Sequence, residues 1–210
     1  SITGTALQMA ASLNELPIAL QGYDTTESWA GFLGQTLLSD FGAACMLGVL
    51  LLLLVAGGEP EYREAFPGKP ALGRVFSRRA FGTKKVFLGL LAGYAMTAAF
   101  FAYQVVFYLG ADRLGAWSPA DVPYSNLLGT SFPWLGVLLM GFVPATTEEF
   151  SSRMFSIPFL RRFAPTWVAV VVPAFVWGFA HAGYPNQPFW IRGVEVGVAG
   201  VVIGVLLLKL

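Results

Sequence analysis

Charged residues, cysteine and histidine are all scarce in this chain of 210 residues. Only 12% of its residues are charged and 56% are hydrophobic, whereas soluble domains have about 25% charged and about 45–50% apolar residues. These proportions exclude a water-soluble domain and a disordered chain. The 13 basic and 12 acidic residues give a net charge of +1, which leaves no basic surface for nucleic acid. The single cysteine, Cys45, excludes a disulfide framework and a zinc site built from cysteines.

Apolar residues are grouped into runs without charges, and a bilayer core of about 30 Å needs about 20 such residues in a helix. The sequence predicts about five spans, at 41–58, 86–111, 127–147, 163–181 and 193–208. Residues 1–40 contain an apolar stretch with Glu15 and Pro17 inside it, which predicts an interfacial or half-inserted helix. The predicted fold class is therefore all-α, a polytopic bundle of transmembrane helices.

Three parts are expected along the chain. Residues 1–40 form the N-terminal amphipathic or interfacial segment, and residues 41–126 form two transmembrane helices joined by a basic loop at 59–85. Residues 127–210 form a C-terminal core, in which the remaining spans lie. We expect candidate chemistry in this last part, because it holds ionisable residues next to apolar runs.

Basic residues predict the orientation of the chain in the membrane. Seven of the 13 lie in the loop 59–85, so the positive-inside rule places that loop in the cytoplasm. By alternation, the loops 112–126 and 182–192 lie outside, and the turn at Arg161 and Arg162 lies inside. The expected location is the inner membrane of a bacterium, where lipids are partners of the chain.

Glycines predict where the spans pack. Gly89 and Gly93 form a GxxxG pattern in the second span, and such patterns let helices approach closely in lipid. The last span carries a longer glycine face made of Gly193, Gly197, Gly200 and Gly204. These patterns indicate helix packing, not chemistry.

Ionisable residues inside or beside a membrane span are costly and so suggest function. Glu148, Glu149 and Arg153 follow the third run, and His181, the only histidine, ends the fourth. On a regular helix Glu149 and Arg153 stand at i and i+4 and can pair, whereas Glu148 points about 100° away. Glu149 is then held ionised, and Glu148 is left to exchange a proton, as hydrolysis requires.

A helical hairpin is predicted between these groups, with its turn at 162–165. Glu148 and His181 are each about 16 residues, or roughly 24 Å of helix, from that turn, so an antiparallel pair brings them to the same depth. A carboxylate facing a histidine suggests activated water and proteolysis or another hydrolysis. The alternative for each residue alone is a solvated charge cluster at a helix end, or a hydrogen-bonded interfacial histidine.

Two further features follow His181 in the sequence. For Glu195, a structural ion pair with Arg192 is favoured over a catalytic role. Tyr184 and Asn186 lie in a proline-containing turn at 184–188 that could gate access to His181.

At these residues the sequence resembles a known family. The stretch from Glu148 to Arg153 matches an EExxxR motif, and the stretch from Trp177 to His181 matches an FxxxH motif with tryptophan for phenylalanine. Both motifs are typical of the CAAX-protease and bacteriocin-processing family, also called Abi, to which the Ras-converting CAAX prenyl endopeptidases belong. The resemblance covers about 127–210. It implies an intramembrane endopeptidase that cleaves a peptide or protein substrate, prenylated or not, and contacts membrane lipids.

The resemblance also implies roles for the motif residues. Glu148 would activate the attacking water with assistance from His181, while Glu149 and Arg153 would shape the site. Trp177, together with Tyr184 and Asn186, is a candidate for substrate binding. The predicted topology places the site nearer the outer face, whereas the eukaryotic relatives are expected to act on cytosolic substrates, so the face to which it opens stays undecided.

One departure from the family concerns its third motif, a second histidine followed four residues later by Asn or Asp. The chain has no second histidine, and the glycine-rich run ending at Leu208 resembles the helix that precedes this motif. Because the chain opens at Ser1 without methionine and stops at Leu210 inside an apolar run, we expect both ends to be cut.

No cofactor is favoured by the sequence. Zinc stays an alternative with Glu148, Glu149 and His181 as ligands, but Arg153 beside the carboxylates would compete with a cation. The alternative function is a membrane protein without enzyme activity, such as a transporter subunit or a bacteriocin immunity factor, whose Glu and His residues relay protons.

Overall fold

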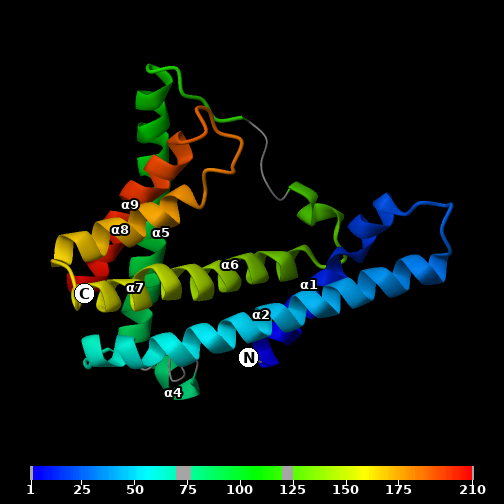
Figure 1. Ribbon diagram of the computed structural model, residues 1–210, viewed down its shortest axis with the longest axis horizontal. Coiled ribbons are helices and arrows are strands. Elements are labelled where there is room, and N and C mark those ends of the chain that lie inside the picture. Colours follow the sequence, from blue (N-terminus) through cyan, green and yellow to red (C-terminus); the bar gives the residue numbers. More distant parts are fainter. Residues whose placement is uncertain (1, 70–76, 120–124, 210) are drawn as a thin grey trace. The chain divides into compact units, whose positions relative to one another are not determined.

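The structure is a computed structural model that describes residues 2–69, 77–119 and 125–209. The regular elements in these ranges are helices, with one isolated β-bridge between Trp117 and Gln187. In chain order they are α1 (Ile2–Ala19), η1 (Leu20–Gly22), α2 (Trp29–Ala65), α4 (Arg78–Phe81), α5 (Lys84–Asp112), η2 (Ser125–Gly129), α6 (Pro133–Glu149), η3 (Phe150–Phe155), α7 (Ser156–Arg161), α8 (Thr166–Phe179) and α9 (Ile191–Lys209) (Figure 1). The predicted all-α fold class is confirmed.

Two compact units divide the chain, and each is described by itself. The first unit consists of Ser1–Gly57 and Asp121–Phe150, and the second consists of Gly58–Ala120 and Ser151–Leu210. The division into three parts that the sequence suggests stays a prediction.

Three of the described helices are long and apolar enough to cross a membrane, namely α2 with 37 residues, α5 with 29 and α9 with 19. They coincide with the first, second and fifth predicted spans. The third and fourth predicted spans fall on α6 with 17 residues and α8 with 14. At 1.5 Å per residue, α8 is only about 21 Å long, which is less than the bilayer core of about 30 Å. The prediction of five spans is therefore not confirmed.

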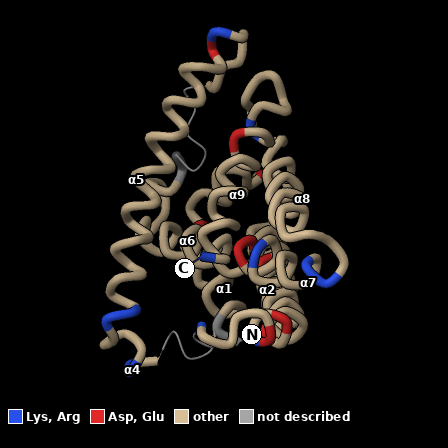
Figure 2. The backbone as a smooth tube through the Cα atoms, turned by 90° about the vertical axis from the view of Figure 1, so that its left-hand side faces the viewer, with Lys and Arg blue, Asp and Glu red and all other residues tan. Residues whose placement is uncertain are grey.

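The charges of α5 lie where a membrane span requires them. Lys84 and Lys85 begin the helix and Asp112 ends it, and no charge lies between them (Figure 2). The side-chain hydroxyl of Thr83 accepts from the backbone N–H of Val86 at 3.4 Å, so the helix starts on an ordinary N-cap. The middle of α5 is thus free of charges and its backbone groups are bonded within the helix, as a membrane span requires.

In the first unit, Asn14 joins α1 to the beginning of α6. Its side chain is 4% exposed. Its amide nitrogen donates to the carbonyl of Phe132 at 3.0 Å, and its oxygen accepts from the backbone N–H of Phe132 at 2.6 Å. Proline at the first position of α6, Pro133, needs no such partner, because it has no N–H. The N-terminal helix is thus tied by a buried amide to the helix that carries the two glutamates.

In the second unit, α8 and α9 pack with their backbones in close approach. A Cβ atom added to Gly178 would lie 2.5 Å from the carbonyl oxygen of Gly193 and 2.5 Å from the nitrogen of Gly197. The glycine face predicted for the last span is confirmed, because Cβ atoms added to Gly200 and Gly204 would also lie 3.0–3.3 Å from side chains of the second unit. Figure 1 shows the two helices side by side.

The GxxxG pattern of α5 does not pack in this way. Within the described ranges, no atom lies within 4 Å of a Cβ added to Gly89 or Gly93. The pattern alone could not separate these two cases, since small residues permit close packing without requiring it.

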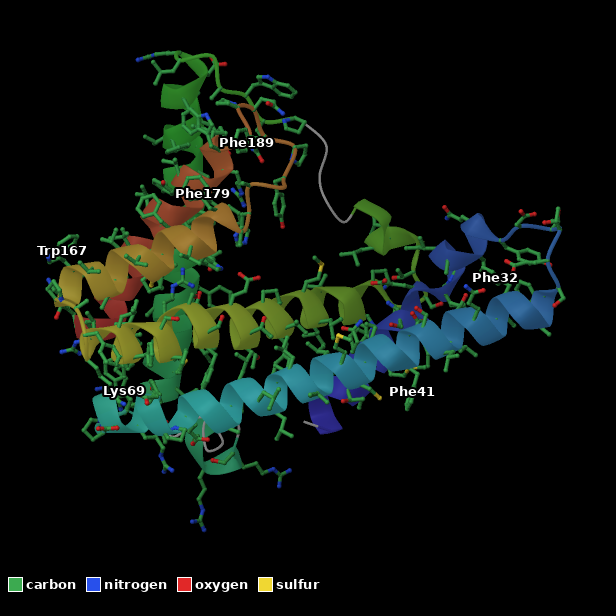
Figure 3. The ribbon with its side chains drawn as sticks, viewed as in Figure 1. Phe32, Phe41, Lys69, Trp167, Phe179 and Phe189 are labelled. Atoms are coloured by element: carbon green, nitrogen blue, oxygen red, sulfur yellow. The ribbon has the colours of Figure 1, made fainter. Side chains whose placement is uncertain are left out.

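Between α7 and α8 the chain turns as predicted. α7 ends at Arg161 and α8 begins at Thr166, with Pro165 as its N-cap residue. At this turn the guanidinium of Arg162 lies 2.8 Å from a carboxylate oxygen of Glu61 and 2.9 Å from one of Glu64. Lys69, labelled in Figure 3, donates to the carbonyl of Leu207 at 2.6 Å, near the end of α9.

Candidate functional site

His181 lies in the turn that follows α8. Its backbone N–H donates to the carbonyl of Gly178 at 2.9 Å, and its own carbonyl accepts from the N–H of Tyr184 at 3.2 Å. The side chain is half-buried. This turn begins the loop between α8 and α9. Figure 3 labels Phe179, the last residue of α8, and Phe189, which lies near the end of the loop.

One hydrogen bond fixes the protonation pattern of the neutral His181 ring. The Nδ1 atom lies 2.9 Å from the backbone carbonyl oxygen of Trp177. A carbonyl oxygen only accepts, so the hydrogen must be on Nδ1, and the lone pair of the neutral ring is on Nε2. In this form Nε2 can take a proton, accept a hydrogen bond or ligate a metal.

Two aromatic rings contact the imidazole in different geometries. The ring of Trp177 meets it edge to face, with centroids 5.1 Å apart and planes at 73°. The ring of Tyr184 stacks on it, with centroids 5.9 Å apart and planes at 21°. Such geometries add to the packing energy of aromatic pairs, so both rings restrict how the imidazole can turn.

Each of these aromatic rings is covered by a guanidinium group. Arg153, which is 3% exposed, places its Cζ atom 3.9 Å from the centroid of the Trp177 ring and donates to the hydroxyl of Ser152 at 3.1 Å. Arg192 lies over the Tyr184 ring at 5.4 Å. A cation over an aromatic face is attracted by the ring quadrupole, more strongly where water is excluded. The second unit thus brings Arg153, Trp177, His181, Tyr184 and Arg192 together.

Glu148 and Glu149 are the last two residues of α6, in the first unit, and both are half-buried. The helix does not continue regularly after them, since Phe150–Phe155 forms a π-helix. Our expectation of a regular α-helix through Arg153 was therefore wrong. A π-helix bonds i to i+5, which changes which side chains share a face of the helix. The pairing of Glu149 with Arg153, and the meeting of Glu148 with His181, stay predictions.

Glu195 forms the structural pair that the sequence suggested. Its side chain is fully buried, and its carboxylate accepts a hydrogen bond from Arg192 three residues earlier. The backbone carbonyl of Glu195 also accepts from the hydroxyl of Tyr103 on α5, at 2.9 Å. A buried charge is tolerated only when it is paired, so this ion pair is part of the packing of α9.

The side chain of Asn186 connects the loop after α8 to α5 and to the segment that follows α5. It is 7% exposed, and its amide nitrogen donates to the hydroxyls of Tyr108 and Ser118 at 2.9 and 3.0 Å. The backbones of Trp117 and Gln187 exchange two further hydrogen bonds of 2.8 and 2.9 Å. Sequence reasoning did not find Tyr103, Tyr108 or Ser118, and no local pattern marks them, because their partners lie about 70–90 residues away along the chain.

The sequence favours no cofactor and leaves zinc as the alternative. In the ranges that the structure describes, no three His, Cys, Asp or Glu side chains gather closely enough to hold a metal ion. His181 offers one suitable atom, Nε2, because Nδ1 is bonded to a carbonyl oxygen. If a metal is used, Glu148 and Glu149 stay the further ligands that the sequence offers.

The fold and the site define a class, a helical membrane protein with ionisable residues packed at the ends of its apolar helices. Residues 130–210 match the family model described as type II CAAX prenyl endopeptidase Rce1-like. This match includes both motifs and confirms the family resemblance for these residues. Neither the curated proteins nor the solved structures that were compared include a match to this chain.

Proposed function

We propose that this chain carries the core of an intramembrane endopeptidase, in which Glu148 activates a water molecule and His181 assists. The observation that carries the proposal is the contact of Arg153 with Trp177, 3.9 Å from the guanidinium carbon to the ring centroid. Arg153 belongs to the first motif and Trp177 to the second, and both motifs lie in the segment that matches a protease family. One packed cluster therefore contains residues from both motifs.

The reaction follows from the chemistry of these groups. The carboxylate of Glu148 takes a proton from water, and the resulting hydroxide oxygen attacks the carbonyl carbon of the scissile peptide bond. When the C–N bond breaks, the proton passes from Glu148 to the leaving nitrogen. His181 Nε2 assists by accepting a hydrogen bond from the water and orienting its oxygen, since its lone pair is fixed there in the neutral ring. Glu149 and Arg153 shape the site.

This mechanism requires no metal. In the alternative version, zinc held by Glu148, Glu149 and His181 would activate the water. The two versions are separated by treating the reconstituted protein with phenanthroline. Unchanged cleavage supports the metal-free mechanism, whereas inhibition that added zinc reverses supports the metal version.

The family name suggests the first probe substrate, a prenylated peptide that ends in a C-a-a-X sequence. Cleavage is followed by mass spectrometry of the released tripeptide, with the protein in lipid nanodiscs. Glu148→Ala and His181→Ala are each expected to slow cleavage by at least about 100-fold, because each removes a group that moves or orients a proton. Glu64→Ala is the matched control, since Glu64 is an exposed acid near the end of α2 that pairs with Arg162. Cleavage that survives both changes would overturn the proposal.

A further inference from the structure

We infer that Arg192 and Glu195 are positioning residues for His181, acting through the ring of Tyr184. No sequence motif connects these residues with the site, and none of them was expected to act on the histidine in this way. The inference rests on the proposed function only in assigning a catalytic role to His181. The positioning itself is a statement about packing in the second unit.

The first step is the ion pair. Glu195 is fully buried and Arg192 has 19% of its side chain exposed, and the two are hydrogen bonded. The bond joins one nitrogen of the guanidinium, Nη1, to one carboxylate oxygen of Glu195. Because Glu195 is buried, this bond holds that end of the Arg192 side chain in place.

The second step leads from the ion pair to the aromatic ring. The guanidinium carbon of Arg192 is 5.4 Å from the centroid of the Tyr184 ring. This distance is inside the range of about 6 Å in which a cation is attracted to an aromatic face. The backbone N–H of Tyr184 donates to the carbonyl of His181 at 3.2 Å, and the attraction of Arg192 is a further restraint that acts on the ring itself.

The third step leads from the aromatic ring to the imidazole. Tyr184 stacks on His181 with only 21° between the planes. Turning the imidazole about its bond to Cβ would break this stack and separate Nδ1 from the carbonyl of Trp177, 2.9 Å away. The stack and the hydrogen bond therefore favour the same orientation, in which the lone pair of the neutral ring is on Nε2.

The same kind of contact occurs twice around the histidine. Arg153 covers the ring of Trp177 and Arg192 covers the ring of Tyr184, and both rings contact the imidazole. Arg153 belongs to a recognised motif, whereas Arg192 and Glu195 come from the start of α9. The start of α9 is itself attached to α5 by the bond from Tyr103 to the Glu195 carbonyl.

Within these 210 residues His181 is the only histidine, and the ¹⁵N-histidine signals that disappear in His181→Gln identify this ring. Spectra of the protein in nanodiscs, recorded where the ring is neutral, report which nitrogen carries the hydrogen. We expect the starting protein to show a single tautomer with hydrogen on Nδ1. Glu195→Gln, Arg192→Leu and Tyr184→Ala should each give a mixture of both tautomers.

Two variants keep the test specific. Tyr184→Phe retains the aromatic ring and should keep the single tautomer, which a general loosening of the loop would not explain. Glu61→Gln breaks another ion pair of the second unit, that with Arg162, and should leave the spectrum unchanged. Circular dichroism and size-exclusion chromatography identify variants that do not fold. Because Tyr184 lies in a loop, Tyr184→Ala remains informative if Glu195→Gln fails to fold.

The outcomes are distinct from those of the cleavage assay. A tautomer mixture in Tyr184→Ala, with Tyr184→Phe unchanged, supports the positioning role whether or not the probe peptide is cleaved. A single tautomer in Tyr184→Ala and Arg192→Leu would overturn it, even if the protein is a protease. Where cleavage is observed, Glu195→Gln should lower kcat by about 10- to 100-fold with little change in KM, since a misplaced group costs rate more than binding.

Discussion

At the scale of single residues, the most informative side chain is Arg153. It is almost fully buried, at 3% exposure, and its guanidinium covers the ring of Trp177. The sequence predicted that Arg153 would belong to the site through a carboxylate, on a regular helix. The structure adds a different partner, an aromatic ring from the second motif.

Arg153→Lys is predicted to reduce cleavage by about 10- to 100-fold although the charge is kept. Lysine is a compact point charge that cannot lie flat on the Trp177 ring, so the ring and the adjacent His181 lose a restraint. Rates are measured with the probe peptide. Arg162→Lys is the control, because the Arg162 side chain is 45% exposed and its pair with Glu64 is solvated. Equal losses in both variants would contradict the prediction.

Part of the site was predictable at this scale, and part was not. The pair of Arg192 and Glu195 is local, three residues apart on one helix, so sequence spacing was sufficient to suggest it. The contacts of Tyr103 and Tyr108 join segments distant in the chain, and a single sequence holds no signal for such pairs. The imidazole orientation depends on a backbone carbonyl, which residue identities do not encode.

At the scale of helices, the close approach of α8 and α9 is the clearest feature. The glycine face of the last span predicted it correctly. The same reasoning also predicted close packing at Gly89 and Gly93 of α5. Apart from the nearby backbone of α5 itself, no described atom lies within 4 Å of a Cβ added to either of them. The π-helix at Phe150–Phe155 was also not foreseen, because hydrophobic periodicity does not register one extra residue per turn.

Gly178→Ala is predicted to destabilise the protein by about 1–3 kcal/mol, as overpacking in a tight interface does. The added methyl group would meet backbone atoms of α9 at 2.5 Å, and backbone cannot move aside as a flexible side chain can. Thermal unfolding in detergent measures the effect. Gly89→Ala is the matched control and should be nearly neutral, and a comparable loss there would mean that the close approach is not the cause.

The basic residues around α4 are predicted to orient the chain. Arg78, Arg79, Lys84 and Lys85 are all exposed, and they immediately precede the apolar length of α5. Replacing all four by glutamine should produce a mixed orientation, because the positive-inside preference depends on these charges. Labelling of a cysteine placed at Gly82, in a Cys45→Ser background, measures which side is exposed. Asp112→Asn should change nothing, since acidic residues contribute little.

At the scale of the whole molecule, the described part of the chain holds three helices that are long and apolar enough to span a membrane, together with the shorter apolar helix α8. Composition predicted the membrane class correctly. The prediction of five spans is not confirmed, since runs without charges also include residues outside the helices. For example, the run 163–181 contains α8, which covers only Thr166–Phe179.

The meeting of Glu148 and His181 is the prediction that concerns the molecule as a whole. With cysteines at these two positions in a Cys45→Ser background, a short bifunctional thiol reagent is expected to crosslink the chain. The expectation rests on their equal distance, about 24 Å, from the turn. A cysteine pair at Gly141 and His181 is the control, because Gly141 is about 10 Å farther along the helix. Equal crosslinking of both pairs, or of the control alone, would contradict the hairpin.

The backbone contact of Gly178 with α9 has a consequence for how the chain enters the bilayer. α8, at about 21 Å, is too short to span the bilayer core by itself, whereas α9 is long and apolar enough to cross it. Only 11 residues separate the two helices, so their contacts are local and form quickly. We expect α8 and α9 to insert into the bilayer together, as one helical hairpin. The loop that carries His181 would then be formed before the hairpin packs with the other helices.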